Sequence, residues 1–286
     1  MISEELRKRI SELNRREIKV WPLGSPPPGK GTPIETPEIN QETITAILGG
    51  ELVSGELGQF LKISHLFRNL QANAGKFLDR YQFVFQKGGF SKQVSEMHND
   101  ILQFLKSSYD KIIYLDIETC GLASSPIFLV GLMYPTVNDF TIEQLFARDY
   151  TEEPALLAYL QSLMEQFDVL VTFNGKTFDY PYLRERGLLH RIYFNPDLTH
   201  FDLLHESRRR WKELLPDCKL KTIERHILKR QRSGDVPSDE IPEIYHEYVR
   251  TGRAARIKNV IQHNLLDIIS MSELALYMIA GREEEE

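Results

Sequence analysis

The stretch Lys111-Ile-Ile-Tyr-Leu-Asp-Ile-Glu-Thr-Cys-Gly-Leu122 sets the fold expectation for this chain. Its first half is a near-continuous apolar run, which is typical of a strand buried on both faces. Because side chains alternate along a strand, Asp116 and Glu118 share one face while Ile117 points into the opposite layer. Two acids this close at the end of a buried strand repel each other unless a cation lies between them, and a hard divalent metal ion is the natural partner.

The Asp-x-Glu pair alone is a weak signal, because solvated acids at a strand end are equally ordinary. Two further segments strengthen it. Asn174-Gly-Lys-Thr-Phe-Asp179 follows a buried apolar run and opens a helix, so Asp179 is expected at a helix N-terminus. His263 and Asp267 are four residues apart in a helical apolar pattern, which places them on one helix face, one turn apart. An acid beside a core stripe needs a partner, since an unpaired buried charge is costly.

The pattern from residue 108 onward predicts an alternation of strands and helices. Strands are expected at 111–118, 126–134, 139–147, 168–173 and 200–204, and helices at 152–166, 178–186, 205–214, 219–229, 240–250 and 256–278. Thr151 is the expected cap of the first helix, and Gly187 the expected stop of the second. Short links predict three antiparallel strands, and crossover helices predict two parallel strands after them. We therefore expect an α/β fold with a mixed five-stranded sheet and flanking helices.

The first part of the chain is less regular. Residues 1–107 are expected to form a smaller N-terminal region, ahead of a main domain at 108–280 and an acidic tail at 281–286. Within that region we expect a short helix in the first fifteen residues, a proline-rich linker, a hairpin within 41–67 and a helix at 92–106. Residues 1–107 could have a scaffold role, with the proline-rich arm docking on an unknown protein partner, or could fold back over the main domain as a substrate lid.

Composition narrows the class of protein. The chain has 286 residues, a formal net charge of −6 and two cysteines without a CxxC motif. This is ordinary globular composition, and the cysteine count excludes a disulfide scaffold and a cysteine-based zinc module. A charged N-terminus and the lack of a long apolar run predict a cytoplasmic protein without membrane contact. The acidic total argues weakly against a nucleic-acid binder.

The charge is distributed unevenly along the chain. Residues 206–232 carry ten basic side chains against four acidic ones. Within this segment, Arg208, Arg209, Arg210 and Trp211 combine guanidinium groups with an aromatic ring, which together can bind a phosphate backbone and stack a base. A solvated helix face is the equally weighted alternative.

These motifs resemble those of the DEDD (DnaQ-like) 3′–5′ exonuclease superfamily. Asp116-Ile-Glu-Thr-Cys-Gly-Leu122 is similar to its first motif, the Asn174 to Asp179 segment to its second, and His263-x-x-x-Asp267 to its third. Over about residues 110–280, the chain looks most like the YprB-like group of RNase H-like nuclease domains, a resemblance that the run from His200 to Trp211 also supports. One departure is that a His occupies the four-residue spacing at which the superfamily usually has a Tyr.

The resemblance implies an RNase H-like sheet and two divalent ions, Mg²⁺ or Mn²⁺. The implied metal ligands are Asp116, Glu118, Asp179 and Asp267. His263 is the implied general base for an attacking water in a two-metal phosphoryl displacement.

The resemblance also implies substrate contacts. Thr119 is expected near the sugar of the terminal nucleotide and Leu122 against its base, with Asn174 and Phe178 shaping the same pocket. For Phe178, simple core packing is an equal alternative.

Three further polar residues lie near this end of the sheet. Asp202, on the last strand, is expected to orient a helix or a neighbouring group of the site. His200 and His205 are expected in capping or core roles rather than as metal ligands.

The expected function is therefore a metal-dependent 3′–5′ exonuclease that hydrolyses phosphodiester bonds of single-stranded DNA. One alternative is a 3′–5′ exoribonuclease, because no residue reveals how the site treats a ribose 2′-OH. A second is a structure-selective endonuclease. A third, from another class, is an RNase H-like module that binds nucleic acid without cleaving it; the presence of all four acids counts against that reading.

Overall fold

A computed structural model of the chain describes residues 41–87, 99–121, 124–195 and 198–280. The helix expected in the first fifteen residues, the proline-rich linker, Leu122 and the acidic tail lie outside these ranges. Within the described ranges, none of the helices is long and apolar enough to span a bilayer.

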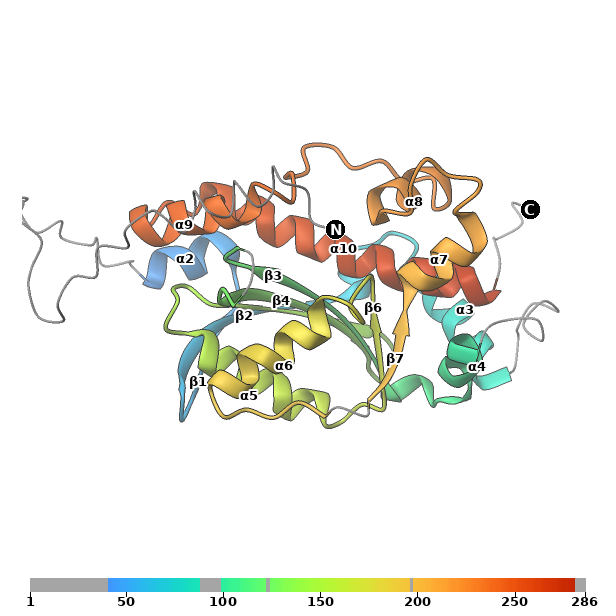
Figure 1. Cartoon of the computed structure of the whole chain (residues 1–286), viewed down its shortest axis with the longest axis horizontal. Coiled ribbons are helices and arrows are strands. Elements are labelled where there is room, and N and C mark those ends of the chain that lie inside the picture. Colours follow the sequence, from blue (N-terminus) through green and yellow to red (C-terminus); the bar gives the residue numbers. More distant parts are fainter. Residues whose placement is uncertain (1–40, 88–98, 122–123, 196–197, 281–286) are drawn as a thin grey trace, which may run out of the picture. The chain divides into compact units, whose positions relative to one another are not determined.

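A mixed sheet of seven strands forms the centre of the structure, in the order β1-β2-β5-β4-β3-β6-β7 (Figure 1). The strands are β1 (Glu51–Gly55), β2 (Gly58–Leu66), β3 (Ile112–Thr119), β4 (Ile127–Pro135), β5 (Phe140–Phe146), β6 (Val169–Thr172) and β7 (Thr199–Asp202). Strands β3, β4 and β5 pair antiparallel, whereas β6 and β7 continue the sheet in parallel beyond β3. The expected class, three antiparallel strands followed by two parallel ones, is confirmed.

The sheet is wider than the expected five strands because the N-terminal hairpin joins it. This hairpin consists of β1 and β2, and β2 pairs antiparallel with β5. Without β2, strand β5 would be a sheet edge with a row of unpaired backbone groups, so the hairpin covers that edge. One sheet thus contains strands from both sides of residue 107, the boundary proposed from the sequence.

Helices flank the sheet on both sides. They are α2 (Gln41–Leu48), α3 (Ala74–Lys87), α4 (Asn99–Lys106), α5 (Glu153–Met164), α6 (Asp179–Leu189), α7 (Leu203–Trp211), α8 (Leu220–His226), α9 (Ile241–Thr251) and α10 (Ala255–Ala280). Single 3₁₀ turns at Phe67–Asn69 and Tyr109–Lys111 precede α3 and β3. Figure 1 shows α5 and α6 on one side of the sheet and the long α10 along the other. Helices α2 and α3 were not expected from the sequence.

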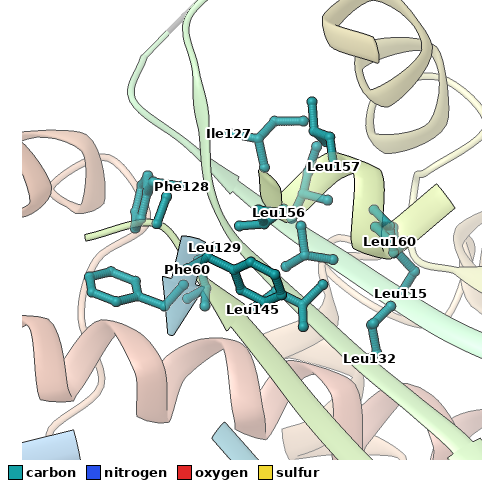
Figure 2. Packing of buried hydrophobic residues seen from close by; sticks show 14 of the residues in the cluster. Phe60, Leu115, Ile127, Phe128, Leu129, Leu132, Leu145, Leu156, Leu157 and Leu160 are labelled. Atoms are coloured by element: carbon teal, nitrogen blue, oxygen red, sulfur yellow. The ribbon is translucent and has the colours of Figure 1, made fainter. Parts of the chain in front are cut away.

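The alternation along β3 separates two apolar layers. Ile113, Leu115 and Ile117 belong to a core cluster that includes α5 and α6, and Figure 2 shows Leu115 near leucines of α5. Ile112 and Tyr114 belong to a second cluster, with α3, α4 and most of α10. By the same alternation, the next two residues of that face are the acids of the Asp-x-Glu pair, which therefore face α10.

Two expected helix boundaries are wrong. Thr151 does not cap α5, because its hydroxyl and backbone N–H both bond to Oδ1 of Asp149, and Glu152 is the residue that precedes the helix. Gly187 does not stop α6, which continues to Leu189. A Cβ at this glycine would lie 2.6 Å from the carbonyl oxygen of Ile192, so the small residue serves close packing rather than termination.

Candidate active site

Asp116 is held by a close approach of α10 to the sheet. In the registers of β3, β4 and β5, Asp116 lies opposite Gly131, and Gly131 opposite Gln144. Asn264 of α10 lies over this row: its Nδ2 donates to Asp116 Oδ2 at 2.9 Å, and its Oδ1 accepts from Gln144 Nε2 at 2.8 Å. A Cβ at Gly131 would collide with the side-chain amide of Asn264, so this position requires glycine.

Asp179 begins α6, where the helix dipole favours its charge. Its Oδ1 accepts a hydrogen bond from the backbone N–H of Ile117 at 3.2 Å, which ties α6 to β3. The loop ahead of α6 is fixed by Asp202, whose carboxylate accepts from the backbone N–H groups of Asn174 at 2.9 Å and Lys176 at 3.0 Å. Asp202 also caps α7. It therefore organises two helix starts beside the candidate site.

His263 and Asp267 lie one turn apart on α10, as the spacing predicts. His263 Nε2 is 3.4 Å from Asp267 Oδ2 and 3.9 Å from Glu118 Oε1. The other ring nitrogen, Nδ1, is 2.6 Å from Asp235 Oδ1. One edge of the buried imidazole therefore faces the carboxylates, and the opposite edge is held by an acid that the sequence analysis did not assign.

Arg232 is a second residue that the sequence analysis left without a role in the site. It lies in the loop between α8 and α9, and its side chain is only 5% exposed. Its Nη2 is 2.5 Å from Asp267 Oδ1 and also pairs with Glu224, while its Nη1 is 3.5 Å from Asp235 Oδ2. The excess of basic residues in 206–232 predicted a positively charged surface. The sequence pattern of this segment did not indicate that the loop carrying Arg232 would pack against α10.

A cavity of about 670 Å³ brings most of the expected site residues together. The expected metal ligands and general base that line it are Asp116, Glu118, Asp179, Asp267 and His263. Of the expected substrate contacts, Asn174, Phe178 and Arg208 also line it. Phe178 is 41% exposed, so it is not simply packed in the core. Lys219 and Lys221 add positive charge to the wall.

The other residues of the basic-aromatic segment point elsewhere. Trp211 is 9% exposed and packs against Tyr277, with ring centroids 6.0 Å apart. Arg209 and Arg210 both pair with Glu206 on their own helix, at 2.7 Å and 2.6 Å. The helical period of α7 therefore turns Trp211 into the core and leaves Arg208 as the residue of this run on the cavity wall.

Three more expected positions lie outside the cavity lining. The hydroxyl of Thr119 donates to the carbonyl of Gly121 at 2.8 Å, which shapes the turn after β3. His200 Nε2 is 2.7 Å from the hydroxyl of Thr172, and burial lowers the pKa of His200 to about 4. His200 therefore has the environment of a neutral, half-buried histidine. Like it, His205 does not line the cavity.

Burial and mutual repulsion raise the pKa values of the cavity acids. Burial, together with the charges of Asp267 and Asp179, raises the pKa of Glu118 to about 8. Burial also raises the pKa of Asp179 to about 7, although backbone hydrogen bonds oppose the shift. The pKa of Asp116 lies well above its usual range for the same reasons. Burial raises the pKa of Asp267 too, against the opposing charge of Arg232. Burial and mutual repulsion therefore disfavour the state in which all four carboxylates are ionised.

The profile of the RNase_H superfamily (RNase_H_2) matches residues 113–279, which run from β3 to α10 and include all four carboxylates of the cavity. The chain belongs to the RNase H superfamily. This agrees with the RNase H-like fold expected from the sequence.

Two other proteins are similar to this RNase H superfamily member. It is 33% identical over 176 residues to the "Uncharacterized protein YprB" of Bacillus subtilis (strain 168), a match that covers 59% of this chain and 42% of YprB. The chain thus matches less than half of the length of that relative. The family B DNA polymerase of the hyperthermophilic archaeon Pyrobaculum calidifontis is also similar in structure, with a TM-score of 0.47, 18% identity, and coverage of 58% of this chain and 24% of the polymerase.

The donor set of this RNase H superfamily site suits a hard divalent cation. All four acids offer oxygen ligands, and their raised pKa values mean that an added cation would relieve repulsion between them. In the ranges described, however, no group of three or more His, Cys, Asp or Glu is already arranged to hold a metal ion. Arg232 instead forms an ion pair with one carboxylate oxygen of Asp267. The four acids therefore have the ligand chemistry that suits a divalent cation, and to bind one their side chains must move closer together.

Proposed function

We propose that the chain is a metal-dependent 3′–5′ exonuclease that acts on single-stranded nucleic acid, with DNA as the preferred substrate. The observation that carries this proposal is the single cavity lined by Asp116, Glu118, Asp179, Asp267 and His263. Membership of the RNase H superfamily supports phosphodiester hydrolysis as the reaction class.

In this proposal the carboxylates hold two divalent ions, Mg²⁺ or Mn²⁺. Asp116, Glu118 and Asp267 would hold one ion, and Asp116 and Asp179 would hold the second. Bound ions of this kind polarise the phosphodiester and stabilise the charge on the attacking and leaving oxygens. Asn264 and the backbone N–H of Ile117 fix two of the carboxylates before any ion arrives.

His263 is the proposed general base. Its Nε2 edge faces Glu118 and Asp267 inside the cavity, so a water lying among the carboxylates is within its reach. The other ring nitrogen, Nδ1, lies on the opposite edge, 2.6 Å from Asp235 Oδ1.

Phe178 and a basic wall support a nucleic-acid strand as the substrate. The basic wall consists of Arg208, Lys219, Lys221 and Arg225. Phe178 is exposed on the lining of the cavity, and its aromatic ring offers a face on which a base can stack. Arg208, Lys219 and Lys221 line the same cavity, and Lys221 also lines an adjoining pocket of about 400 Å³ that includes Arg225. These cations provide a path for the phosphates behind the terminal nucleotide.

A non-catalytic nucleic-acid-binding module is the second candidate. The ion pair between Arg232 and Asp267 favours it, because a guanidinium already neutralises one of the proposed metal ligands. The two candidates differ in whether divalent ions bind and whether the strand is shortened.

Degradation of labelled substrates tests the proposal. Single-stranded DNA, duplex DNA and RNA of one sequence, each labelled at the 5′ end, are incubated with the purified protein and Mg²⁺, then Mn²⁺. The exonuclease proposal predicts a descending ladder, fastest on single-stranded DNA. A faster ladder on RNA indicates an exoribonuclease, internal cuts alone indicate an endonuclease, and intact substrates that are nevertheless bound indicate a binding module.

A further inference from the structure

Four ionisable side chains form a closed ring at the edge of the cavity. Arg232 contacts Asp267 at 2.5 Å, Asp267 contacts His263 at 3.4 Å, His263 contacts Asp235 at 2.6 Å, and Asp235 returns to Arg232 at 3.5 Å. Two members come from α10 and two from the loop between α8 and α9. The loop therefore supplies a partner to each of the two α10 residues that the proposed mechanism uses.

Asp235 has the geometry of a residue that sets the orientation of an imidazole. Its Oδ1 is 2.6 Å from Nδ1 of His263, while its Oδ2 pairs with Lys221 at 2.9 Å and lies 3.5 Å from Arg232. A carboxylate can only accept a hydrogen bond, and the carboxylate at Nδ1 is the nearer one, at 2.6 Å against 3.4 Å from Nε2 to Asp267, so the single proton of the neutral imidazole belongs on Nδ1. That leaves a lone pair on Nε2, the nitrogen that faces Glu118 and Asp267.

We propose that Asp235 is a positioning residue that holds His263 in the tautomer with Nε2 free to accept a proton. This inference rests on the proposed function for its catalytic consequence, but the tautomer itself is a property of the protein alone. Lys221 and Arg232 keep Asp235 ionised and in place, since each pairs with its second oxygen. In other proteins too, a carboxylate bonded to one ring nitrogen of a histidine sets which nitrogen carries the proton.

The variant Asp235→Asn tests the tautomer directly. The Asn side chain is close in size but carries an N–H₂ that can donate to Nδ1, which moves the imidazole proton to Nε2. Nitrogen and carbon NMR shifts of the histidine ring report the tautomer in metal-free protein, and the spectrum of His263→Gln identifies the His263 signals. We expect the Nδ1–H form in the unmodified chain and a shift toward the Nε2–H form in Asp235→Asn. An unchanged tautomer overturns the proposal.

Kinetics on single-stranded DNA provide the second readout. We expect Asp235→Asn to lower kcat by about 10–100-fold, the usual effect of losing such a partner, with KM within about twofold. Asp235→Glu retains a carboxylate and should recover part of the loss. Asp239→Asn is the matched control, because Asp239 is an exposed acid of the same loop and should leave kcat unchanged. Mn²⁺ affinity, measured by calorimetry, should change by less than about twofold in Asp235→Asn, since Asp235 is not a proposed ligand.

The outcomes separate this inference from the proposed function. If the unmodified chain cleaves no substrate, the proposed function fails while the NMR experiment still decides the role of Asp235. If the chain cleaves DNA and Asp235→Asn keeps full kcat, the positioning role is wrong. A loss of kcat with an unchanged tautomer, or an equal loss in Asp239→Asn, also overturns it.

Discussion

Asn264 donates a hydrogen bond to Asp116 at 2.9 Å, from a helix that lies directly over a glycine of the neighbouring strand. This bond links α10 to β3 at the acid that the proposed function assigns to both metal ions. Its existence depends on Gly131, because any side chain there would occupy the space of the Asn264 amide.

Gly131→Ala should therefore damage both stability and activity. Displacing a buried amide from a well-packed site costs about 1–3 kcal/mol, and loss of the bond to Asp116 should lower nuclease activity at least tenfold. Urea denaturation and the cleavage rate measure the two effects. Gly55→Ala is the control, because no atom lies within 4 Å of a Cβ at Gly55, and it should cost less than about 0.5 kcal/mol. Equal effects of the two substitutions would contradict the account.

Removal of Arg232 should strongly destabilise the metal-free protein. The guanidinium pairs with Asp267 and Glu224 and lies near Asp235, so Arg232→Gln leaves buried acids without their cation. Breaking a buried pair in this way typically costs about 3–5 kcal/mol of unfolding free energy. Arg256→Gln removes an exposed arginine that also pairs with two acids, and should cost about 0–1 kcal/mol. Urea unfolding at neutral pH compares them; similar losses would show that burial of Arg232 contributes little.

The stability of the metal-free protein should fall as the pH rises. Glu118 has its pKa raised from 4.5 to about 8, so between these values the folded state binds more protons than the unfolded state. The unfolding free energy therefore decreases over this range and is lowest above the raised pKa.

The variant Glu118→Gln isolates this effect. It should be more stable than the unmodified chain at about pH 8, by on the order of 1 kcal/mol, and close to it at about pH 5. Thermal unfolding in a chelating buffer measures the stability of the two proteins at each pH. Glu56→Gln, at an exposed position of the hairpin, should show no such gain in stability as the pH rises. A Glu118→Gln protein that is less stable at high pH would rule out repulsion among the acids.

The basic wall should contribute to binding of the strand. We expect the double variant Lys219→Gln with Arg225→Gln to raise the Kd for single-stranded DNA about tenfold or more at low salt, and to reduce the slope of log K against log salt by about 1.4, that is 0.7 per lost phosphate contact. Fluorescence anisotropy in chelator measures binding without cleavage. Lys76→Gln with Lys106→Gln removes the same charge at exposed positions of α3 and α4. If this control pair weakens binding equally, net charge rather than the wall determines affinity.

The sequence predicted the sheet and the shared face of the two acids because both depend on local periodicity. The alternation around Asp116 and Glu118 is a property of one strand, and the spacing of His263 and Asp267 is a property of one helix. Their convergence on one cavity was expected from the resemblance to a known superfamily, and the structure places all of them on its lining.

The parts that could not be predicted depend on how distant segments pack. Arg232 and Asp235 lie in an irregular loop, whose course against α10 leaves no periodic signal. Trp211 was expected beside the substrate because of its neighbouring arginines, but its position on α7 turns it toward Tyr277. Similarly, nothing in the hairpin pattern showed that β2 would pair with β5, since an edge strand accepts any partner of suitable length.

The most direct test of the central claim is the time course of 5′-labelled single-stranded DNA with Mg²⁺, for the unmodified chain and for Asp116→Asn and Asp267→Asn. Thermal unfolding first establishes that both variants are folded. The account predicts a ladder that descends one nucleotide at a time with the unmodified chain, no shortening with either variant, and no shortening when Mg²⁺ is chelated. Shortening by the Asp116→Asn protein at the unmodified rate, or cleavage that continues in chelator, would contradict it.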